Sequence, residues 1–153
     1  MANQQTNIVN NKLQLNIVTP RGVKFVEEAD MIIMRCIDGD LGILPGHEPV
    51  SVVLGDGILR IRNDGVEKKL AVFGGIAKIN DKAVTILSTI AQRPEEIDLE
   101  RAEKDRKEAE AALIEGPKEL QIQSSLVLLR RSLVRIEVSL HLEETDYSDD
   151  DQE

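Results

Sequence analysis

The stretch "ILRIRNDGVEKKLAVFGGIAKINDKAVTIL", residues 58–87, decides the fold class. Short runs rich in Val, Ile and Leu alternate in it with residues that favour turns. Asn63-Asp64-Gly65 and Asn80-Asp81 tolerate positive φ angles and are typical of hairpin turns. Leu59 and Ile61 point to one side of their strand, and Ile58, Arg60 and Arg62 point to the other. This alternation indicates that one face of the strand is exposed to solvent. The stretch therefore predicts antiparallel strands joined by tight turns.

The same pattern extends over Lys12 to Thr89. The runs "LQLNIV", "VKFV" and "MIIMRCI" predict further short strands, and Gly55-Asp56-Gly57 predicts another hairpin turn before "ILRIR". No helix of useful length fits between these turns. Antiparallel strands that close over an aliphatic core form a small sandwich or flattened barrel. We therefore expect a β-sandwich domain over residues 13–93, preceded by a flexible N-terminal segment, residues 1–12.

A helix is predicted after Pro94. The run "EEIDLERAEKDRKEAEAALIE" is rich in Ala, Glu, Lys and Arg and almost free of β-branched residues. Asp98 is a suitable N-cap, and Gly116-Pro117 supplies a C-terminal cap followed by a residue that cannot continue the helix. These signals predict a first helix that ends just before residue 116.

A second helix is predicted over residues 118–140. Its aliphatic side chains recur at alternating steps of four and three residues, which is typical of a coiled-coil seam. The seam consists of Ile122, Leu126, Leu129, Leu133, Ile136 and Leu140. Small side chains on the first helix, at Ala102, Ala109 and Ala112, allow close approach. The predicted fold class is α+β: an antiparallel β-sandwich or flattened barrel, followed by an antiparallel two-helix hairpin over residues 94–141.

The negative charge of the chain is concentrated at its C-terminus. The formal net charge is −9, but the last twelve residues hold seven acidic and no basic side chains, and without them 19 basic stand against 21 acidic side chains. Like charges and low apolar content oppose folding. We therefore expect a disordered acidic tail over residues 142–153. Because no signal peptide and no long apolar run is recognisable, we expect neither export nor membrane anchoring.

Several chemistries have no support in the sequence. Phosphate-binding glycine loops are missing, and two histidines and a single cysteine, Cys36, make no zinc-ligand set. His47, Glu48 and Ser51 are too close in sequence to converge as a catalytic triad. With three aromatic residues and a nearly neutral body, nucleic-acid binding is not expected. We therefore expect a protein that is not an enzyme and has no metal site.

Arg131 and Arg135 lie one turn apart on the second helix, roughly opposite the predicted seam. Two interpretations stay open. The pair can be a solvated cationic face, or it can be a clamp for phosphate or carboxylate, since guanidinium groups offer paired donors to both.

The combination of motifs resembles a known family. The runs "LQLNIVTPRGVKFVEEADMIIMRCIDGDLGILPGHEPVSVVLGDGILRI", "AVFGGIAKINDKAVTILS" and "IDLERAEKDRKEAE" are similar to the epsilon subunit of bacterial F-type ATP synthases, called delta in mitochondria. The similarity covers about residues 13–138. It implies a central-stalk rotor subunit that binds the gamma subunit, with its sandwich seated on the c-ring.

The resemblance implies a role for the corner "GDLGILPGHEPV", residues 39–50. Its prolines fix φ and its glycines at 39, 42 and 46 permit tight bends, which indicates a stiff protrusion. In the family this corner lies near the c-ring. The residues expected to serve that contact are Asp40, Gly42, Pro45, Gly46, His47 and Glu48. The alternative is that the glycines and prolines only shape a turn.

The resemblance also implies regulation by the hairpin. In this family it folds onto the sandwich or extends along gamma into the alpha/beta catalytic head and blocks ATP hydrolysis, and Arg130, Arg131 and Arg135 match the basic stretch involved. Some bacterial members bind ATP through a short motif that matches residues 97–102 here. The expected ATP-binding residues are Ile97, Asp98, Arg101, Ala102, Arg131 and Arg135. No cofactor is required, and ATP would be regulatory. Asp98 and Arg101 can instead be merely a helix cap and a salt bridge.

The expected place of the protein is peripheral, at the cytoplasmic face of the cell membrane, with membrane contact only through the complex. Two other functions stay open. The chain can be mainly an ATP-sensing regulatory module, or a free-standing adaptor that uses its hairpin to bind a partner.

Overall fold

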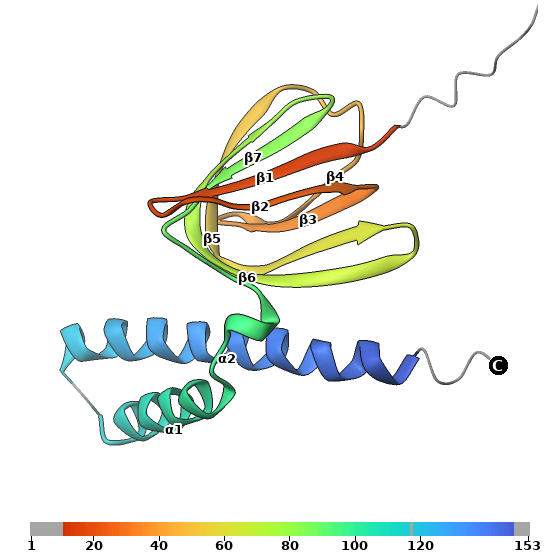
Figure 1. Ribbon diagram of the computed structural model, residues 1–153. Helices are drawn as coiled ribbons and strands as arrows, with labels where there is room; N and C mark the ends of the chain where they lie inside the picture. The colour runs from red at the N-terminus through yellow and green to blue at the C-terminus, as the bar shows by residue number, and fades with distance from the viewer. Residues whose placement is uncertain (1–10, 117, 149–153) are drawn as a thin grey trace, which may run out of the picture.

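The computed structural model describes residues 11–116 and 118–148. Strands occupy the N-terminal part of the chain and helices the C-terminal part (Figure 1). The elements are β1 (Leu13–Thr19), β2 (Gly22–Ala29), β3 (Met31–Cys36), β4 (Gly39–Ile43), β5 (Val50–Asn63), β6 (Val66–Ile79), β7 (Ala83–Leu87), β8 (Ile90–Gln92), the 3₁₀ turn η1 (Pro94–Glu96), α1 (Leu99–Ile114) and α2 (Glu119–Ser148). The predicted class, a β-sandwich followed by two helices, is confirmed.

The strands form one sheet that folds over itself. Its order is β2-β1-β7-β6-β5-β3-β4, and β8 pairs with β6. All neighbours are antiparallel except β1 and β7, which are parallel. The prediction of purely antiparallel pairing was wrong for this pair, because turn residues report only on consecutive strands.

The two long strands β5 and β6 bend together. Their pairing skips Gly55 and Gly74, and Gly74 and Gly75 both have positive φ angles, 67° and 114°. Residues 71–73 of β6 pair with β8, and residues 76–79 pair with β7. The predicted hairpin turn at Gly55-Asp56-Gly57 was wrong, since β5 continues through it. Gly57 is needed because a Cβ there would lie 2.5 Å from the Cβ of Arg35.

The predicted turns on either side are confirmed. Asp64 and Gly65 have φ angles of 50° and 79° between β5 and β6. Between β6 and β7, Asn80 Oδ1 accepts hydrogen bonds from the backbone N–H groups of Lys82 and Ala83, at 2.9 and 2.8 Å. Such side chain to backbone bonds fix a tight turn.

The sandwich encloses an aliphatic core drawn from all seven long strands. Its fully buried members include Leu13, Leu15, Ile17, Ile32, Ile61 and Val84. Burial of these side chains supplies most of the driving force for folding, at about 25 cal/mol per Å² of apolar surface. This core lies within the strand domain and does not depend on the helices.

The helix boundaries agree in part with the sequence. Asp98 caps α1, and Gly116 follows its end with a φ angle of 70°. The second helix extends to Ser148, so the prediction of a disordered tail was wrong for residues 142–148. Once a helix is nucleated, each added residue gains a hydrogen bond, and "LEE" at 142–144 favours helix. Residues 149–153, and residues 1–10 of the predicted flexible N-terminus, lie outside the described residues.

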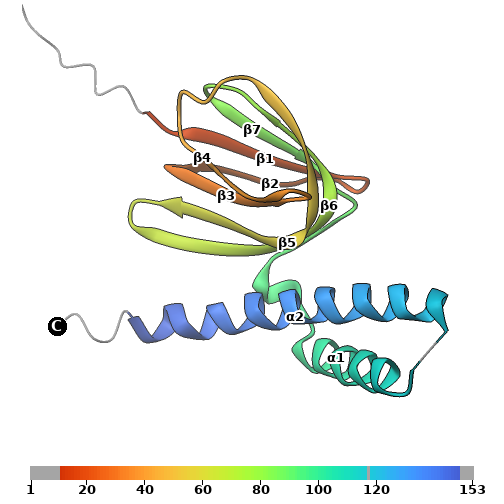
Figure 2. The ribbon, with the colours of Figure 1, turned by 180° about the vertical axis from the view of Figure 1, so that it is seen from behind.

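The hairpin packs with α2 against the sandwich and α1 against α2 (Figures 1 and 2). Ala102 and Ala109 are buried, as their small size predicts, whereas Ala112 is half-buried. The predicted apolar seam of α2 is not the buried face: Ile122, Leu126, Leu133 and Leu140 remain 37–48% exposed. Ser132 and Val138 are buried instead. The heptad spacing was right for a helix, but the surface of the sandwich selects another face.

Candidate functional site

The site is the contact between α2 and the bend of the sandwich. Val138 is fully buried against Ala71 and Phe73 of β6, and Val134 and Ile97 pack around them. This cluster is separate from the sandwich core and much smaller. It positions α2 so that Arg135 and Arg131, one and two turns earlier in the helix, contact β5, β6 and β8.

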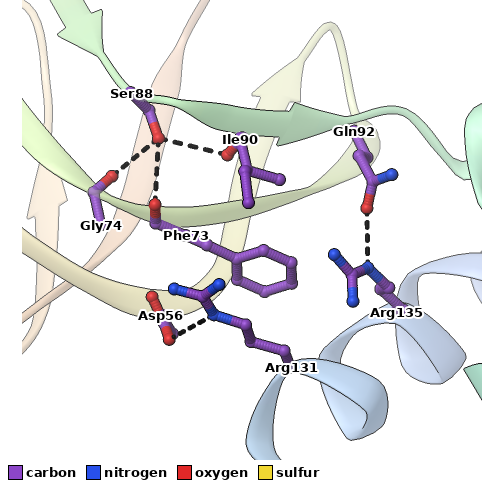
Figure 3. A network of polar contacts seen from close by, with 8 residues as sticks. All are labelled: Asp56, Phe73, Gly74, Ser88, Ile90, Gln92, Arg131 and Arg135. Carbon is purple, nitrogen blue, oxygen red and sulfur yellow. Dashed lines mark hydrogen bonds and ion pairs between the residues drawn. The ribbon is translucent and has the colours of Figure 1, made fainter. Parts of the chain in front are cut away.

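Both arginines are held by side chains of the sandwich (Figure 3). Arg131 Nε donates to Asp56 Oδ2 at 3.0 Å, an ion pair whose partners are 34% and 14% exposed. Arg135 Nε donates to Gln92 Oε1 at 2.8 Å. The interpretation of this pair as a freely solvated cationic face was therefore wrong. Arg131 acts as a clamp for a carboxylate of its own chain.

The ring of Phe73 lies between the two guanidinium groups. Their Cζ atoms are 5.2 Å from its centroid for Arg131 and 4.8 Å for Arg135. Cations at this distance from an aromatic face are stabilised by about 0.5–2 kcal/mol, depending on exposure. Phe73 therefore joins the apolar cluster to the charged groups.

Ser88 fixes the backbone that carries this ring. Its buried hydroxyl lies 2.8 Å from the carbonyl oxygen of Gly74 and 3.2 Å from those of Phe73 and Ile90 (Figure 3). One hydroxyl hydrogen is thus shared among three acceptors where β6 bends. The contact ties β8 to β6 just before the chain leaves for the helices.

The charges of the site are not fully balanced. Burial lowers the pKa of Arg135 from its usual value, and the neighbouring Arg131 lowers it further, whereas Asp105 and Asp56 oppose that shift. Arg135 remains charged because the guanidinium pKa is very high. The lowered pKa thus reflects first the removal of the guanidinium group from water and second its closeness to Arg131.

The predicted ATP motif lies at the start of α1. Asp98 Oδ1 accepts from the backbone N–H of Arg101 at 3.1 Å, and Arg101 Nε pairs with Asp105 at 3.3 Å. Ala102 is buried and Ile97 is half-buried in the small apolar cluster. Asp98 and Arg101 thus have the cap and salt-bridge contacts of the alternative interpretation. The charge of Asp105 also raises the pKa of Arg135, opposing the effect of burial.

Arg130 points elsewhere. It is exposed and lines a cavity of about 590 Å³ together with Arg35, Arg60 and Asp56. Of the three arginines expected to block hydrolysis, the structure therefore brings Arg131 and Arg135 together against the sandwich and leaves Arg130 outside that contact.

The predicted rotor corner is divided between a strand and a loop. Asp40 and Gly42 lie in β4, where Asp40 pairs with Arg35 at 3.4 Å. Gly42 has no positive φ and pairs with Ile33, so its predicted role in a tight bend was wrong. Its lack of a side chain instead leaves room for Met31, whose Cε would lie 3.0 Å from a Cβ.

The loop after β4 holds the other four residues of the corner. Gly46 has a φ of 88°, and its N–H donates to the carbonyl oxygen of Asp81 at 2.8 Å. His47 Nδ1 lies 2.7 Å from the backbone oxygen of Glu48, while Pro45 is half-buried. Bonding to the β6–β7 turn gives this loop a fixed shape.

Sequence reasoning missed Asp56, Phe73 and Gln92 as partners of the arginines. Asp56 was assigned to a turn and Phe73 to a strand, and no motif marks Gln92. The one available signal was that Phe73 is one of three aromatic residues in the chain. In the described part of the chain, no helix is long and apolar enough to cross a membrane, and no three metal-binding side chains cluster.

Two family models match consecutive parts of the chain. The model "ATP synthase, Delta/Epsilon chain, beta-sandwich domain" matches residues 12–94, and "ATP synthase, Delta/Epsilon chain, long alpha-helix domain" matches residues 95–139. The chain belongs to the ATP synthase delta/epsilon family. The recognition of this family from its motifs is thus confirmed, and both described domains fall within it.

Individual members of the delta/epsilon family agree over most of their length. The ATP synthase epsilon chain of Desulforamulus reducens is 35% identical over 126 residues, 82% of this chain and 96% of that protein. The epsilon chain of Bacillus velezensis is 37% identical over 83% of this chain and 96% of its own length. A chain in the structure of Euglena gracilis mitochondrial ATP synthase, OSCP/F1/c-ring, superimposes with a TM-score of 0.72 at 28% identity, covering 86% of this chain and 82% of that chain.

Proposed function

We propose that this chain is the central-stalk subunit of an F-type ATP synthase, which couples rotation between the gamma subunit and the c-ring. The observation that carries the proposal is the match of both family models in sequence order. The likeness to a chain from an assembly named for its F1 and c-ring supports the same place. In this proposal the chain catalyses no reaction and acts by binding other subunits. It lies at the cytoplasmic face of the membrane and does not enter the membrane.

The rotor contact of this proposal is the corner around β4 and the following loop. Asp40 and Glu48 are exposed there, as is the apolar side chain of Leu44, at 57%. The bond from Gly46 to Asp81 ties the loop to a second turn. A loop with few internal degrees of freedom transmits torque with little deformation, which suits a seat on the c-ring.

The hairpin is the regulatory part of the proposal. In the docked arrangement Arg131 and Arg135 are occupied by Asp56, Gln92 and Phe73. The apolar contact that holds α2 is small. Two positively charged groups, Arg131 and Arg135, lie close together beside it. Such a contact can open at modest cost, and opening would free both guanidinium groups to bind carboxylates of the catalytic head and block hydrolysis.

ATP is proposed as a regulatory ligand of the docked hairpin. Arg101 pairs with Asp105, whose charge also acts on Arg135, and Arg131 is close enough to lower the pKa of Arg135, so the three guanidinium groups are proposed to bind one polyphosphate. The phosphates would compete with Asp56 and Asp105 for these donors. A ligand at 100 times its dissociation constant stabilises the state it binds by about 2.7 kcal/mol. That free energy is enough to favour the docked hairpin when the docked and open states are otherwise of nearly equal stability.

The direct experiment compares two forms of the chain on a reconstituted catalytic head. We expect ATP hydrolysis to be faster with a chain that ends at Gln92 than with the full chain, because the sandwich keeps its own core and only the inhibitory helices are lost. Equal rates, with both forms shown to bind gamma, would remove the inhibitory role and leave the rotor role in place.

A further inference from the structure

A cavity of about 360 Å³ lies beside the hairpin contact, away from the arginine pair. Its walls come from three parts of the chain: β2 and β6 of the sandwich, the segment at Arg93 and Pro94 that leads into the helices, and His141 of α2. Figures 1 and 2 show this half of α2 running below the hairpin of β5 and β6. The wall at His141 is therefore present only while α2 is docked.

Arg93 is the unusual group in this cavity. Its guanidinium Cζ lies 5.0 Å from the centroid of the Phe25 ring, and its Nη2 donates to the backbone oxygen of Lys24 at 3.2 Å. Its Nε is buried and has no hydrogen-bond partner among the described residues. A buried donor without a partner is costly, and a charged one more so.

The other cations of the cavity are already paired. Lys68 is bonded to Glu27, and Lys69 lies 3.9 Å from Glu137. Glu67 pairs with Arg62 at 2.9 Å. Within the described residues Arg93 has no ion pair, and the lining holds three cations, Lys68, Lys69 and Arg93, against the two carboxylates of Glu67 and Glu95. With the paired groups set aside, Arg93 and Glu95 are the charged groups of the lining for which the described residues show no ion pair, and the Arg93 guanidinium is open to a partner.

The rest of the lining is apolar and aromatic. Phe25, Val66, Leu70 and Pro94 supply most of it. Small-molecule sites commonly have about 300–1,000 Å³ and combine apolar walls with a few oriented polar groups. The Arg93 guanidinium above the Phe25 ring can bind one anionic group, and the apolar walls can bind the hydrocarbon part of the same ligand.

We propose that this cavity binds a small aliphatic or aromatic carboxylate, with its carboxylate on Arg93 and its apolar body against Phe25 and Leu70. The carboxylate accepts from the guanidinium group of Arg93, because paired guanidinium donors suit the two oxygens of a carboxylate. The site is distinct from the proposed ATP residues, none of which lines it.

Such a ligand binds both domains at once. His141 lies 2.9 Å, by its Nε2, from the backbone oxygen of Glu67, so α2 forms one wall of the cavity only in the docked arrangement. At 100 times its dissociation constant the ligand raises the ratio of docked to open hairpin about a hundredfold. This consequence rests on the proposed role of the hairpin, but binding itself does not.

The two histidines of the chain provide the test. His141 lines the cavity, whereas His47 lies in the loop between β4 and β5 and serves as an internal control. Hexanoate is titrated into the full-length protein while the imidazole resonances of both are followed by NMR. We expect a saturable shift of His141 alone, with a dissociation constant of about 1 mM or below. No saturable shift, or equal shifts of both histidines, would overturn the proposal.

Variants and analogues separate the chemistry. Arg93→Gln should weaken hexanoate binding at least about tenfold, the effect of a lost charged hydrogen bond, and Arg93→Lys should weaken it less. Arg21 is an exposed arginine in the β1–β2 turn, and Arg21→Gln should leave the dissociation constant for hexanoate unchanged.

1-Hexanol and inorganic phosphate should each bind at least about tenfold more weakly than hexanoate. If Arg93→Gln binds as the parent does, or hexanol or phosphate binds as well as hexanoate, the assignment is wrong. Arg93→Lys decides the role of the charge should Arg93→Gln fail to fold.

Discussion

Arg131 and Asp56 form an ion pair of 3.0 Å across 75 positions of the chain, joining the second helix to the bend of the sandwich. The pair lies beside the cluster of Phe73 and Val138, so it marks the same contact that buries α2. In this arrangement Arg131 and Arg135 are both bound to the sandwich.

Asp56→Ala should loosen the hairpin without unfolding the sandwich. Loss of the carboxylate removes one charged hydrogen bond to a partly exposed arginine, so we expect the docking free energy to fall by about 1 kcal/mol after allowance for solvent screening. Hydrogen exchange of α2 amides measures this change. Asp38→Ala, at an exposed position on the β3–β4 turn, is the matched control. In a double-mutant cycle with Arg131→Ala, zero coupling energy would show that the pair does not hold the hairpin.

Phe73→Leu should weaken the same contact by a different route. Leucine keeps most of the apolar volume but loses the aromatic ring, whose centroid lies 4.8 and 5.2 Å from the two guanidinium carbons. We expect a loss of about 1–2 kcal/mol in thermal or denaturant unfolding. An equal loss in a background of Arg131→Ala with Arg135→Ala would mean that packing alone explains the effect.

Gly75→Ala should damage the sandwich itself. A Cβ at Gly75 would lie 2.2 Å from the backbone oxygen of Leu87, and the φ of 114° already disfavours any side chain. We expect a loss of at least about 3 kcal/mol in the free energy of unfolding. Gly65→Asn is the control, because that turn has open space and asparagine tolerates its φ of 79°, so its cost should stay within about 1 kcal/mol. Similar costs for both would contradict the close packing of β6 on β7.

The group around Asp30 should make stability depend on acid pH. A hydrogen bond from the backbone of Asp64, followed by that from Lys12, lowers the pKa of Asp30 below its ordinary 3.8. Because the folded pKa is the lower one, the stabilisation is present above 3.8 and is lost as pH falls through the folded pKa. The difference in melting temperature between the parent and Asp30→Ala should therefore shrink in that range. A constant difference would show that the charge of Asp30 contributes nothing.

Local features of the fold could be predicted because local chemistry determines them. Asn63-Asp64-Gly65 forms a turn through its own backbone preferences, and Asp98 caps α1 through a bond to Arg101 three residues later. The parallel pairing of β1 with β7 and the bend at Gly74 and Gly75 depend on contacts between distant segments. No short pattern records such contacts, so Gly55-Asp56-Gly57 was misassigned as a turn.

The functional site also has one part that the sequence predicts and one part that depends on contacts between distant segments. The positions of Arg131 and Arg135 on the side of α2 away from the Ile122 to Leu140 seam follow from helical periodicity. Their partners do not, because Asp56, Phe73 and Gln92 converge only after the sheet has folded over itself. The family resemblance predicts an inhibitory role for the arginines, and the structure shows the contacts that occupy Arg131 and Arg135.

The most direct test is ATP hydrolysis by a reconstituted catalytic head with the parent chain and with the double variant Asp56→Ala, Gln92→Ala. The variant keeps every proposed inhibitory arginine and removes only the side chains of the sandwich that bind Arg131 and Arg135. Stronger inhibition by the variant is predicted, because its hairpin opens more readily. Inhibition equal to or weaker than that of the parent, at matched binding to gamma, would contradict the view that docking on the sandwich withholds these arginines.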